Sequence, residues 1–488
     1  MSPSFILSLF LGYFVLLYLI TRIVAKRADN FTFFLGNKVS PWYVVAYGMI
    51  GASISGVTFI SIPGDVGASS FSYLVIVFGY FLGYVVIIHV LLPLYYRLNL
   101  TSIYTYLQQR FGFWSHKTGS FFFIISRLIG ASFRMYLVVN VLHIFVFRAW
   151  GIPFAFTTFI SIVLILLYTM RGGVKAIVWT DTLQTTFMLL ALVISVLIIG
   201  KDMNLATGGL ISEVFHSHYS KMIFTDLNDK RFFLKQFFSG VFIAIVMTGL
   251  DQEMMQKNLS CRNLRDAQKN MYWLSSALIP VNILFLTLGA ILYLYAHQKG
   301  ITVPATTDDL FPVVALNYLG PAAGIIFLIG IISAAYPSAD GALTALTTCF
   351  SVDFLRFNDR HDLTEQQKIR IRYMVNLGFG ALVFLIIVVF RMINDASVIS
   401  KLFTMAGYTY GPLLGLFAFG LFTRLTVRDK WVPVIAVLSP AISYILSIHS
   451  VGWFNGYHFG FELLIVNGIL TFTGLLIVNK GLAANSPK

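Results

Sequence analysis

The stretch Tyr47–Gly64, YGMIGASISGVTFISIPG, decides how the fold is interpreted, because it lies in an apolar span but has a poor helix former at its middle. Its central segment Gly51–Gly56 holds two glycines and two serines, which weaken a helix where lipid offers no replacement hydrogen bonds. Such a break is tolerated where it faces protein or a water-filled cavity, and its freed carbonyl groups can then hold a cation. The stretch predicts either a discontinuous helix at a binding site or a seam of small residues packed between helices.

The composition around this stretch predicts an all-α polytopic membrane protein. The 488 residues are 58% hydrophobic and 11% charged, with a mean hydropathy of +0.81. A membrane-spanning helix needs about 20 apolar residues, and the first apolar segment is expected to be a retained helix rather than a signal peptide. Thirteen segments meet the length requirement: 4–23, 42–64, 72–96, 118–147, 153–170, 176–200, 236–256, 271–296, 320–349, 373–394, 398–423, 431–449 and 458–479.

The net charge of +14 follows the expected membrane topology. Most Lys and Arg residues fall in the loops after the odd-numbered spans and at the C-terminus. The positive-inside rule then predicts an external N-terminus and a cytoplasmic C-terminus in a cell membrane. The basic residues are thus expected to meet anionic membrane lipid and not nucleic acid.

The spans form two sets of five, and each set begins with a helix interrupted by glycine. The interruptions are Gly51–Gly56 in the first set and Gly249, close to Asp251, in the second. An odd number of spans inverts the second set relative to the first, and interrupted helices at matching positions point to a transporter site. The expected organisation is one transmembrane domain, 1–488, made of 1–40 (N-terminal helix and connection), 41–200 (first set), 201–235 (external loop), 236–424 (second set) and 425–488 (two C-terminal helices).

The connection after the third span, residues 93–107, is rich in tyrosine and leucine. This pattern predicts an interfacial amphipathic helix with an aromatic belt. The chain has no Gly-Lys-Ser/Thr phosphate loop, which argues against an ATP-driven pump.

Acidic residues inside the spans are informative because the chain has only 20 Asp and Glu. Asp181 and Asp340 lie at similar expected depths in the sixth and ninth spans. An intramembrane carboxylate is either a functional site or an acid neutralised by a structural partner. Asp251 and Asp353 lie near helix ends, where a capping or solvated role is expected.

Two arginines in the fourth span, Arg127 and Arg134, lie seven residues apart and therefore on nearly the same helix face. A buried guanidinium group stays charged and suits carboxylates. Arg134 is thus either an anchor for an anionic solute or part of a structural pair. Arg127 lies nearer the cytoplasmic end and is expected to be structural.

The ninth span contains Pro337, which cannot donate a hydrogen bond to the carbonyl of Ser333. The freed carbonyl would lie beside the hydroxyl of Ser338. Oxygen ligands of this kind suit Na⁺, a hard cation, although a proline kink can also serve helix packing alone.

With these motifs in place, the sequence resembles the sodium:solute symporter family over nearly the whole chain after the first span. The resemblance implies a LeuT-like fold, an inverted 5+5 repeat with one extra N-terminal helix and two extra C-terminal helices. The motifs that carry it are Arg171–Gln184 (RGGVKAIVWTDTLQ), Thr248–Gln252 (TGLDQ) followed by Lys257, the ninth span with Ser351–Asp353 (SVD), and Gly407–Pro412 (GYTYGP).

The family's sodium site can be carried over residue by residue. It implies carbonyl ligands from the broken helix, with a carbonyl, a side chain and a hydroxyl from the ninth span. Family members usually carry a hydroxyl residue where this chain has proline, so one ligand is missing unless the carbonyl of Ser333 replaces it. The implied Na⁺ ligands are Gly51, Ile54, Ala334, Pro337 and Ser338.

A second sodium site, found in some members, would use Asp181 with the region of Asp340 and Gly341. A carboxylate and a glycine stand there in place of hydroxyl residues, which leaves open the ion stoichiometry and the choice of Na⁺ or H⁺. The substrate side is similar to the sialic-acid branch of the family. The matching residues are Ser53, Ser55, Thr58 and Arg134.

The predicted function is Na⁺-coupled import of a small polar, anionic organic solute by alternating access, with a single chain sufficient for transport. Alternatives are a proton-coupled or neutral-sugar symporter of the same fold and a transporter-like sensor. The few residues after Lys480 disfavour the sensor. An enzyme is not expected, because most of the nine histidines lie in loops or at span ends.

Overall fold

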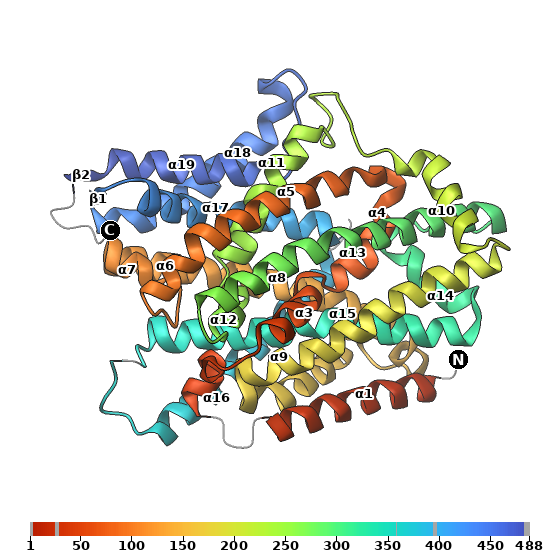
Figure 1. The fold of residues 1–488 in the computed structure, drawn as a ribbon, viewed down its shortest axis with the longest axis horizontal. Coiled ribbons are helices and arrows are strands. Elements are labelled where there is room, and N and C mark those ends of the chain that lie inside the picture. The colour runs from red at the N-terminus through yellow and green to blue at the C-terminus, as the bar shows by residue number, and fades with distance from the viewer. Residues whose placement is uncertain (1–2, 25–28, 358, 394–397, 483–488) are drawn as a thin grey trace.

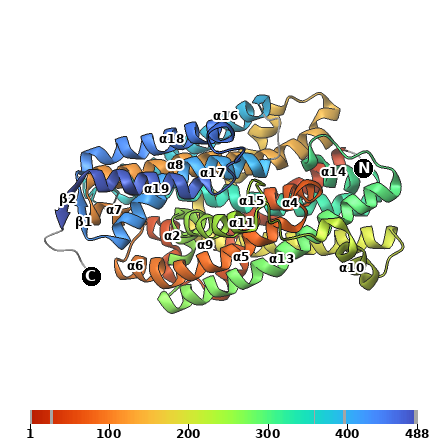
Figure 2. The same ribbon diagram turned by 90° about the horizontal axis from the view of Figure 1, so that it is seen from above.

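The computed structural model describes residues 3–24, 29–357, 359–393 and 398–482. Most helices run side by side along the long axis of the molecule (Figure 1), and the view from above shows the same bundle (Figure 2). The first helices are α1 (Pro3–Val24), α2 (Asn30–Leu35), α3 (Trp42–Ser53), α4 (Gly56–Ser69), α5 (Tyr73–Val86), α6 (Leu92–Arg97), α7 (Thr105–Arg110), α8 (Phe113–Phe145), α9 (Phe154–Asp202) and α10 (Thr207–His216). The later helices are α11 (Phe233–Ala244), α12 (Gln252–Leu259), α13 (Leu264–Lys299), α14 (Leu310–Asn317), α15 (Gly320–Cys349), α16 (Glu365–Ile393), α17 (Val398–Phe422), α18 (Val432–Trp453) and α19 (Leu463–Ile477).

Two short strands were not expected in an all-α chain. β1 (Leu425–Val427) lies between α17 and α18, and β2 (Asn479–Leu482) follows α19. They pair antiparallel and join the ends of the last helices. The fold is otherwise helical, as predicted.

Among the described residues, nine helices are long and apolar enough to cross a membrane, and a tenth is added if one bent pair is counted as a single span. Two shorter apolar helices, Phe154–Met170 and Leu463–Ile477, accompany them. Each of the thirteen predicted segments is mostly helical where the structure describes it, although the last begins five residues before α19 and two contain the helix breaks. The number of crossings itself stays a prediction.

Two helices are broken where the sequence predicts an interruption. α3 and α4 have 12 and 14 residues, so each extends only about 18–21 Å along its axis, and only together can they cross the hydrocarbon core of about 30 Å. The second break separates Phe233–Gly249 from Gln252–Leu259, with a bend of 62°. In both cases the chain continues on the far side of the break in helical form.

The fifth and sixth predicted spans form one helical run, α9, with a sharp turn at Gly173. This residue has φ 51° and ψ −144°, a conformation that favours glycine. A Cβ atom at this position would lie 2.4 Å from the carbonyl oxygen of Phe33. The turn predicted between these spans therefore depends on a residue without a side chain.

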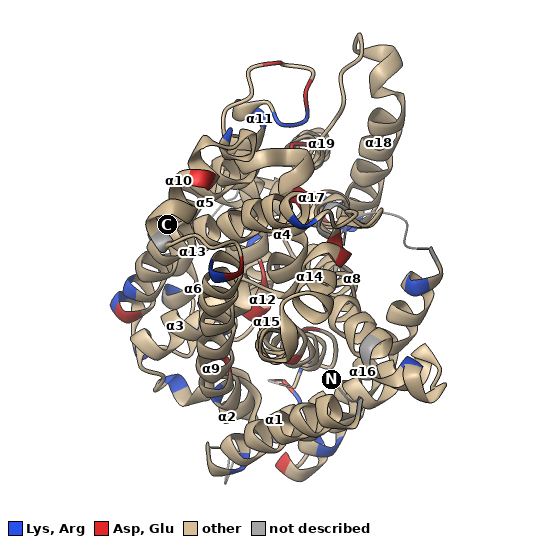
Figure 3. Ribbon diagram, turned by 90° about the vertical axis from the view of Figure 1, so that its right-hand side faces the viewer, with Lys and Arg blue, Asp and Glu red and all other residues tan. Residues whose placement is uncertain are grey.

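Helix α15 lies at the centre of the bundle and is buried along most of its length. It packs against α9 and α8 and also contacts both halves of the first broken helix, α3 and α4. α1 packs against α9, and Phe14 of α1 meets Tyr336 of α15 with ring centroids 4.8 Å apart. Charged residues are sparse along the helices, and acidic residues appear near α12 and α15 in the interior (Figure 3).

Candidate functional site

The first broken helix unwinds at Ile54 and Ser55, as the sequence predicts. Ile54 has φ −93° and ψ 87°, and Ser55 is extended with φ −83° and ψ 178°. The amide of Ile54 still donates to the carbonyl of Ile50, at 2.8 Å. The last carbonyl groups of a helix have no partner within that helix, so the break frees the carbonyls that follow Ile50, including that of Gly51.

α15 meets this break at Ala335. A Cβ atom at Gly56, the first residue of α4, would lie 3.0 Å from the Cβ atom of Ala335, so the two helices are in direct contact. Ser338 lies about one turn further along α15 and is fully buried, and its hydroxyl has no hydrogen-bond partner among the described residues. Pro337 lies inside the helix and leaves the carbonyl of Ser333 without its usual donor.

These oxygen atoms fit a hard monovalent cation. Freed carbonyls come from the residues around Gly51 and Ile54, and an unpartnered hydroxyl comes from Ser338. Ala334, the remaining predicted ligand, is fully buried on α15 beside Ala335. The structure thus brings together the two chain segments on which the predicted Na⁺ site depends.

The second break is different, because tyrosine hydroxyls donate hydrogen bonds to the carbonyl groups that the break frees. Tyr95 donates to the carbonyl of Gly249 and Tyr104 to the carbonyl of Leu250, each at 2.8 Å. Asp251 caps the start of α12, accepting hydrogen bonds from two backbone amides. The capping role predicted for this aspartate is confirmed, although the residue is fully buried.

The same contacts correct the interpretation of residues 93–107. This connection is not an interfacial amphipathic helix: α6 ends at Arg97, a loop follows, and α7 begins at Thr105. Tyr95 and Tyr104 are fully buried against the second break rather than exposed at a membrane surface. The prediction was wrong because tyrosine-rich segments suit both a membrane interface and a buried site with hydroxyl acceptors.

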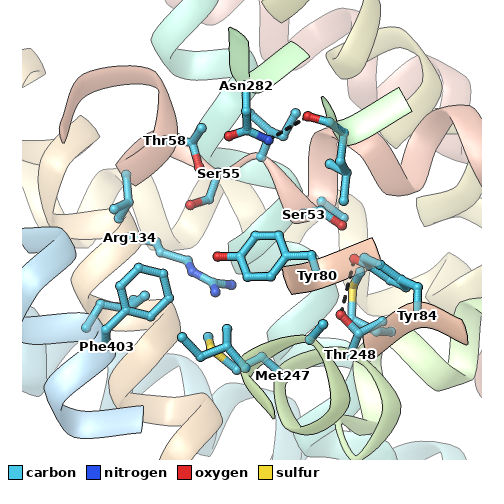
Figure 4. Close-up of a pocket in the computed structure, with 18 of the residues that line it drawn as sticks. Ser53, Ser55, Thr58, Tyr80, Tyr84, Arg134, Met247, Thr248, Asn282 and Phe403 are labelled. Carbon is cyan, nitrogen blue, oxygen red and sulfur yellow. Dashed lines mark hydrogen bonds between the residues drawn. The ribbon is translucent and has the colours of Figure 1, made fainter. Parts of the chain in front are cut away.

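A cavity of about 90 Å³ lies beside the first break, and the four residues predicted for the substrate all line it. Figure 4 shows the guanidinium group of Arg134 extending between Tyr80 and Phe403, with Ser55 and Thr58 nearby. Arg134 is 8% exposed and makes no ion pair with a carboxylate of the described residues. The predicted set in this lining is Ser53, Ser55, Thr58 and Arg134.

The neighbouring arginine has another role. Arg127 forms an ion pair with Glu253, and its Nη1 atom lies 3.7 Å from Asp251 Oδ2. Tyr410 donates a hydrogen bond to the same Asp251 oxygen at 2.7 Å. Of the two arginines on this face of α8, only Arg134 therefore remains available for an anionic ligand.

Several other lining residues escaped the sequence analysis. Asn282, in the middle of an apolar helix, lines the cavity and donates its amide to the carbonyl of Leu278 at 2.7 Å. An asparagine within a span is an unusual feature that could have marked it. The remaining uncharged polar and aromatic lining residues were not predicted to contact the solute: Tyr73, Tyr80, Tyr84, Thr248 and Phe403. Of these, only Thr248 belongs to a motif named above, Thr248–Gln252.

A larger cavity of about 280 Å³ adjoins the first. Tyr73 and Phe403 line both cavities, so these two rings stand between them. Lys230 and Arg231 of the predicted external loop contribute to the larger cavity. We refer to this larger cavity as the vestibule.

The comparison with known protein families agrees with this geometry. The sequence model of the sodium:solute symporter family matches residues 33–428. The chain belongs to the sodium:solute symporter family. Family members are multi-pass membrane transporters.

Individual members of the sodium:solute symporter family are similar over most of the chain. The sodium/sialic acid symporter NanT of Aliivibrio fischeri is 23% identical over 464 residues, covering 91% of this chain and 88% of its own. The human sodium-coupled monocarboxylate transporter 1 is 26% identical over 408 residues, covering 80% of this chain and 64% of its own. A solved Na⁺-coupled sialic acid symporter, in a substrate-bound outward-open state, shares the fold with a TM-score of 0.82 at 20% identity, covering 98% of this chain and 99% of that one.

The two carboxylates that the family resemblance assigns to a second sodium site have other partners here. Asp181, on α9, accepts a hydrogen bond from the Nζ atom of Lys257 at 2.7 Å. Asp340, on α15, accepts one from the hydroxyl of Tyr168 at 2.7 Å. Both carboxylates are buried, and Asp340 lies within electrostatic range of Asp181 and of Lys257. The sequence indicated the two acids and placed Lys257 in a family motif, but it did not predict that Lys257 pairs with Asp181.

Proposed function

We propose that this chain is a secondary active symporter that imports a small organic anion together with Na⁺. The observation that carries the proposal is a buried, unpaired Arg134 in a cavity beside the freed carbonyls of a broken helix. A carboxylate on the solute would neutralise the guanidinium group and accept charge-assisted hydrogen bonds from it. The similarity to sialic acid and monocarboxylate symporters supports a carboxylate as the common feature of the solute.

The proposed Na⁺ site is formed by carbonyls from Gly51, Ile54 and Ala334, the hydroxyl of Ser338, and the backbone around Pro337. These residues join the α3–α4 break to α15. Bound Na⁺ would fix the conformation of the break and so fix Ser53, Ser55 and Thr58, which line the solute cavity. Solute and Na⁺ would therefore strengthen each other's binding by the same factor, which is the thermodynamic condition for coupling.

The other end of the solute would meet uncharged polar groups. Asn282 and the tyrosine hydroxyls at positions 73, 80 and 84 line the cavity together with Arg134. These groups can bind hydroxyl or carbonyl oxygens of a polar solute but cannot neutralise a second charge. The composition of the lining thus favours a monoanion.

We also propose the inverted 5+5 arrangement and the orientation expected from the sequence. In this scheme residues 41–200 and 236–424 are the two repeats, the N-terminus is external and the C-terminus is cytoplasmic. The matching positions of the two helix breaks support the repeat. One copy of the chain is expected to transport.

Two measurements on the purified protein test the proposed function: a thermal-shift screen of ligands, and solute uptake after reconstitution into liposomes. A thermal-shift screen of sialic acids, monocarboxylates and neutral sugars, each with and without Na⁺, would identify the solute class. We expect a carboxylate to stabilise the protein only when Na⁺ is present, and an inward Na⁺ gradient to drive its uptake. Uptake that does not depend on Na⁺ but follows a pH gradient would instead establish a proton symporter. Stabilisation by neutral sugars alone would exclude Arg134 as the residue that binds a solute carboxylate.

A further inference from the structure

Asp181, the carboxylate that the family resemblance assigns to a second sodium site, already forms an ion pair with a lysine of this chain. The Nζ atom of Lys257 lies 2.7 Å from Asp181 Oδ2 and 3.2 Å from Glu253 Oε1. The side chains of all three residues are at most 2% exposed. An ammonium group is a compact point charge, so it presents to Asp181 the same sign and magnitude of charge as Na⁺.

Gly341 leaves room for Glu253, the carboxylate that also binds Lys257. A Cβ atom at Gly341 would lie 2.3 Å from Glu253 Oε1, so even alanine would collide with this carboxylate. Glu253 holds Lys257 on one side and Arg127 on the other. Position 341 therefore provides no hydroxyl ligand, because the carboxylate that anchors the lysine fills the space.

Oxygen atoms remain near Asp181, so it is charge rather than a lack of ligands that opposes a second ion. One oxygen of Asp181 and one of Asp340 have no hydrogen-bond partner among the described residues. A Na⁺ ion on Asp181 would lie next to the ammonium group of Lys257. Two like charges repel strongly in a buried site of low dielectric constant.

We propose that the ammonium group of Lys257 takes the place of a second Na⁺ ion, so that this symporter binds one Na⁺ per chain. The proposal deepens the proposed function and rests on Na⁺ binding at the first break. The residues around Asp181 and Asp340 thus do not fit a second sodium site, although the family resemblance would assign one to them.

One Na⁺ has a consequence for the driving force. A monoanion that enters with one Na⁺ moves no net charge, whereas two Na⁺ ions would move one positive charge inward. The steady-state accumulation of the solute should therefore follow the Na⁺ gradient and not change with the membrane potential. A potassium diffusion potential set with valinomycin in proteoliposomes would measure this dependence.

Direct binding of radiolabelled Na⁺ to the purified protein gives the ion count without knowledge of the solute. We expect wild type to bind one Na⁺ per chain, and Lys257→Arg, which keeps the positive charge, to bind one as well. Lys257→Ala leaves Asp181 without its cation and should bind two. Asp181→Asn combined with Lys257→Met removes both charges of the pair, leaves Glu253 paired with Arg127, and should return the count to one.

Asp181→Asn alone separates the proposal from its alternative. If Asp181 is closed to Na⁺, this variant keeps the wild-type count and the wild-type affinity for Na⁺. Two Na⁺ ions in wild type, one of them lost in Asp181→Asn, would overturn the proposal while leaving the proposed function intact. Should Lys257→Ala fail to fold, the comparison of wild type, Asp181→Asn and the double variant still decides between one ion and two.

Failure of the proposed function has a different outcome. Wild type that binds no Na⁺ would overturn the coupling ion itself. In that case the number of Na⁺ ions bound by Lys257→Ala would decide the role of Lys257. One Na⁺ bound by this variant supports the proposal that Lys257 takes the place of a Na⁺ ion, and none bound overturns it.

Discussion

At the scale of single residues, two arginines on one face of α8 have opposite roles because of what faces them. Arg127 is neutralised by Glu253 and lies near Asp251, whereas Arg134 has no carboxylate partner among the described residues. The sequence places both on one helix face and cannot show which is paired, because the acids lie more than a hundred residues away. The unpaired charge in a cavity distinguishes Arg134 as the candidate for binding an anion.

Arg134→Ala should weaken binding of the anionic solute but spare binding of Na⁺. A hydrogen bond to a charged group contributes about 1.5–3 kcal/mol, so we expect a loss of roughly 10- to 150-fold in affinity. Isothermal titration with the solute and thermal shift with Na⁺ would measure the two effects separately. Arg127→Ala is the matched control: it leaves buried acids with one cation fewer and should lower stability even without solute. Equal loss of solute and Na⁺ binding in Arg134→Ala would make Arg134 structural.

Pro337→Ser should raise the affinity for Na⁺, because serine adds the hydroxyl that the proposed site lacks. One additional ligand worth about 1.4 kcal/mol corresponds to a tenfold lower Kd. The change also adds an amide that can donate to the carbonyl of Ser333. Titration of radiolabelled Na⁺ would measure the shift, with Pro280→Ala in α13 as a proline control away from the site. A weaker affinity would indicate that the freed carbonyl of Ser333 is itself a ligand, and no change would mean that the backbone already completes the site.

At the scale of helices, the two breaks have different environments. Local composition predicts both breaks, since each has glycine within a span. It cannot predict that Tyr95 and Tyr104 occupy the carbonyls at one break only, because these contacts join segments about 150 residues apart. The carbonyl groups at the Ile54 break therefore remain available to a cation, whereas those at the Leu250 break are already hydrogen-bonded to tyrosines.

The position of the first break depends on close packing of α3 against α9. Gly51 donates its amide to Thr185 Oγ1 at 3.1 Å, and a Cβ atom at Gly51 would lie 2.2 Å from that oxygen. Gly51→Ala should therefore push α3 away from α9 and weaken Na⁺ binding by about tenfold or more, as expected for a ligand displaced from its position. Gly12→Ala in α1, where a Cβ atom meets nothing within 4 Å, is the control.

Na⁺ titration of Gly51→Ala and Gly12→Ala, with helical content checked by circular dichroism, would measure the effect. Thr185→Ala combined with Gly51→Ala relieves the collision and should restore part of the affinity. Unchanged Na⁺ binding in Gly51→Ala would show that the site does not include the carbonyl of this residue.

At the scale of the whole molecule, hydropathy predicted the positions of the helices well, because lipid requires long apolar segments with satisfied backbone groups. The site was predicted in part: Arg134 and the residues of the first break lie together, as the sequence indicated. The ion pair between Asp181 and Lys257 was not predicted, since it depends on how α12 packs against α9. The charged side chains that this packing buries can be located only in three dimensions.

The distribution of positive charge also predicts the orientation of the whole molecule. Asn228, between α10 and α11, is expected outside, and His361, between α15 and α16, is expected in the cytoplasm, because three predicted spans separate them. Both residues are exposed, and both native cysteines are buried, so wild type should react little with a maleimide. In intact cells a membrane-impermeant maleimide should label Asn228→Cys but not His361→Cys, and His361→Cys should react after the membrane is made permeable. The reverse pattern would show that the orientation is opposite to the predicted one, with the vestibule facing the cytoplasm. Labelling of both positions from one side would contradict the predicted number of spans between them.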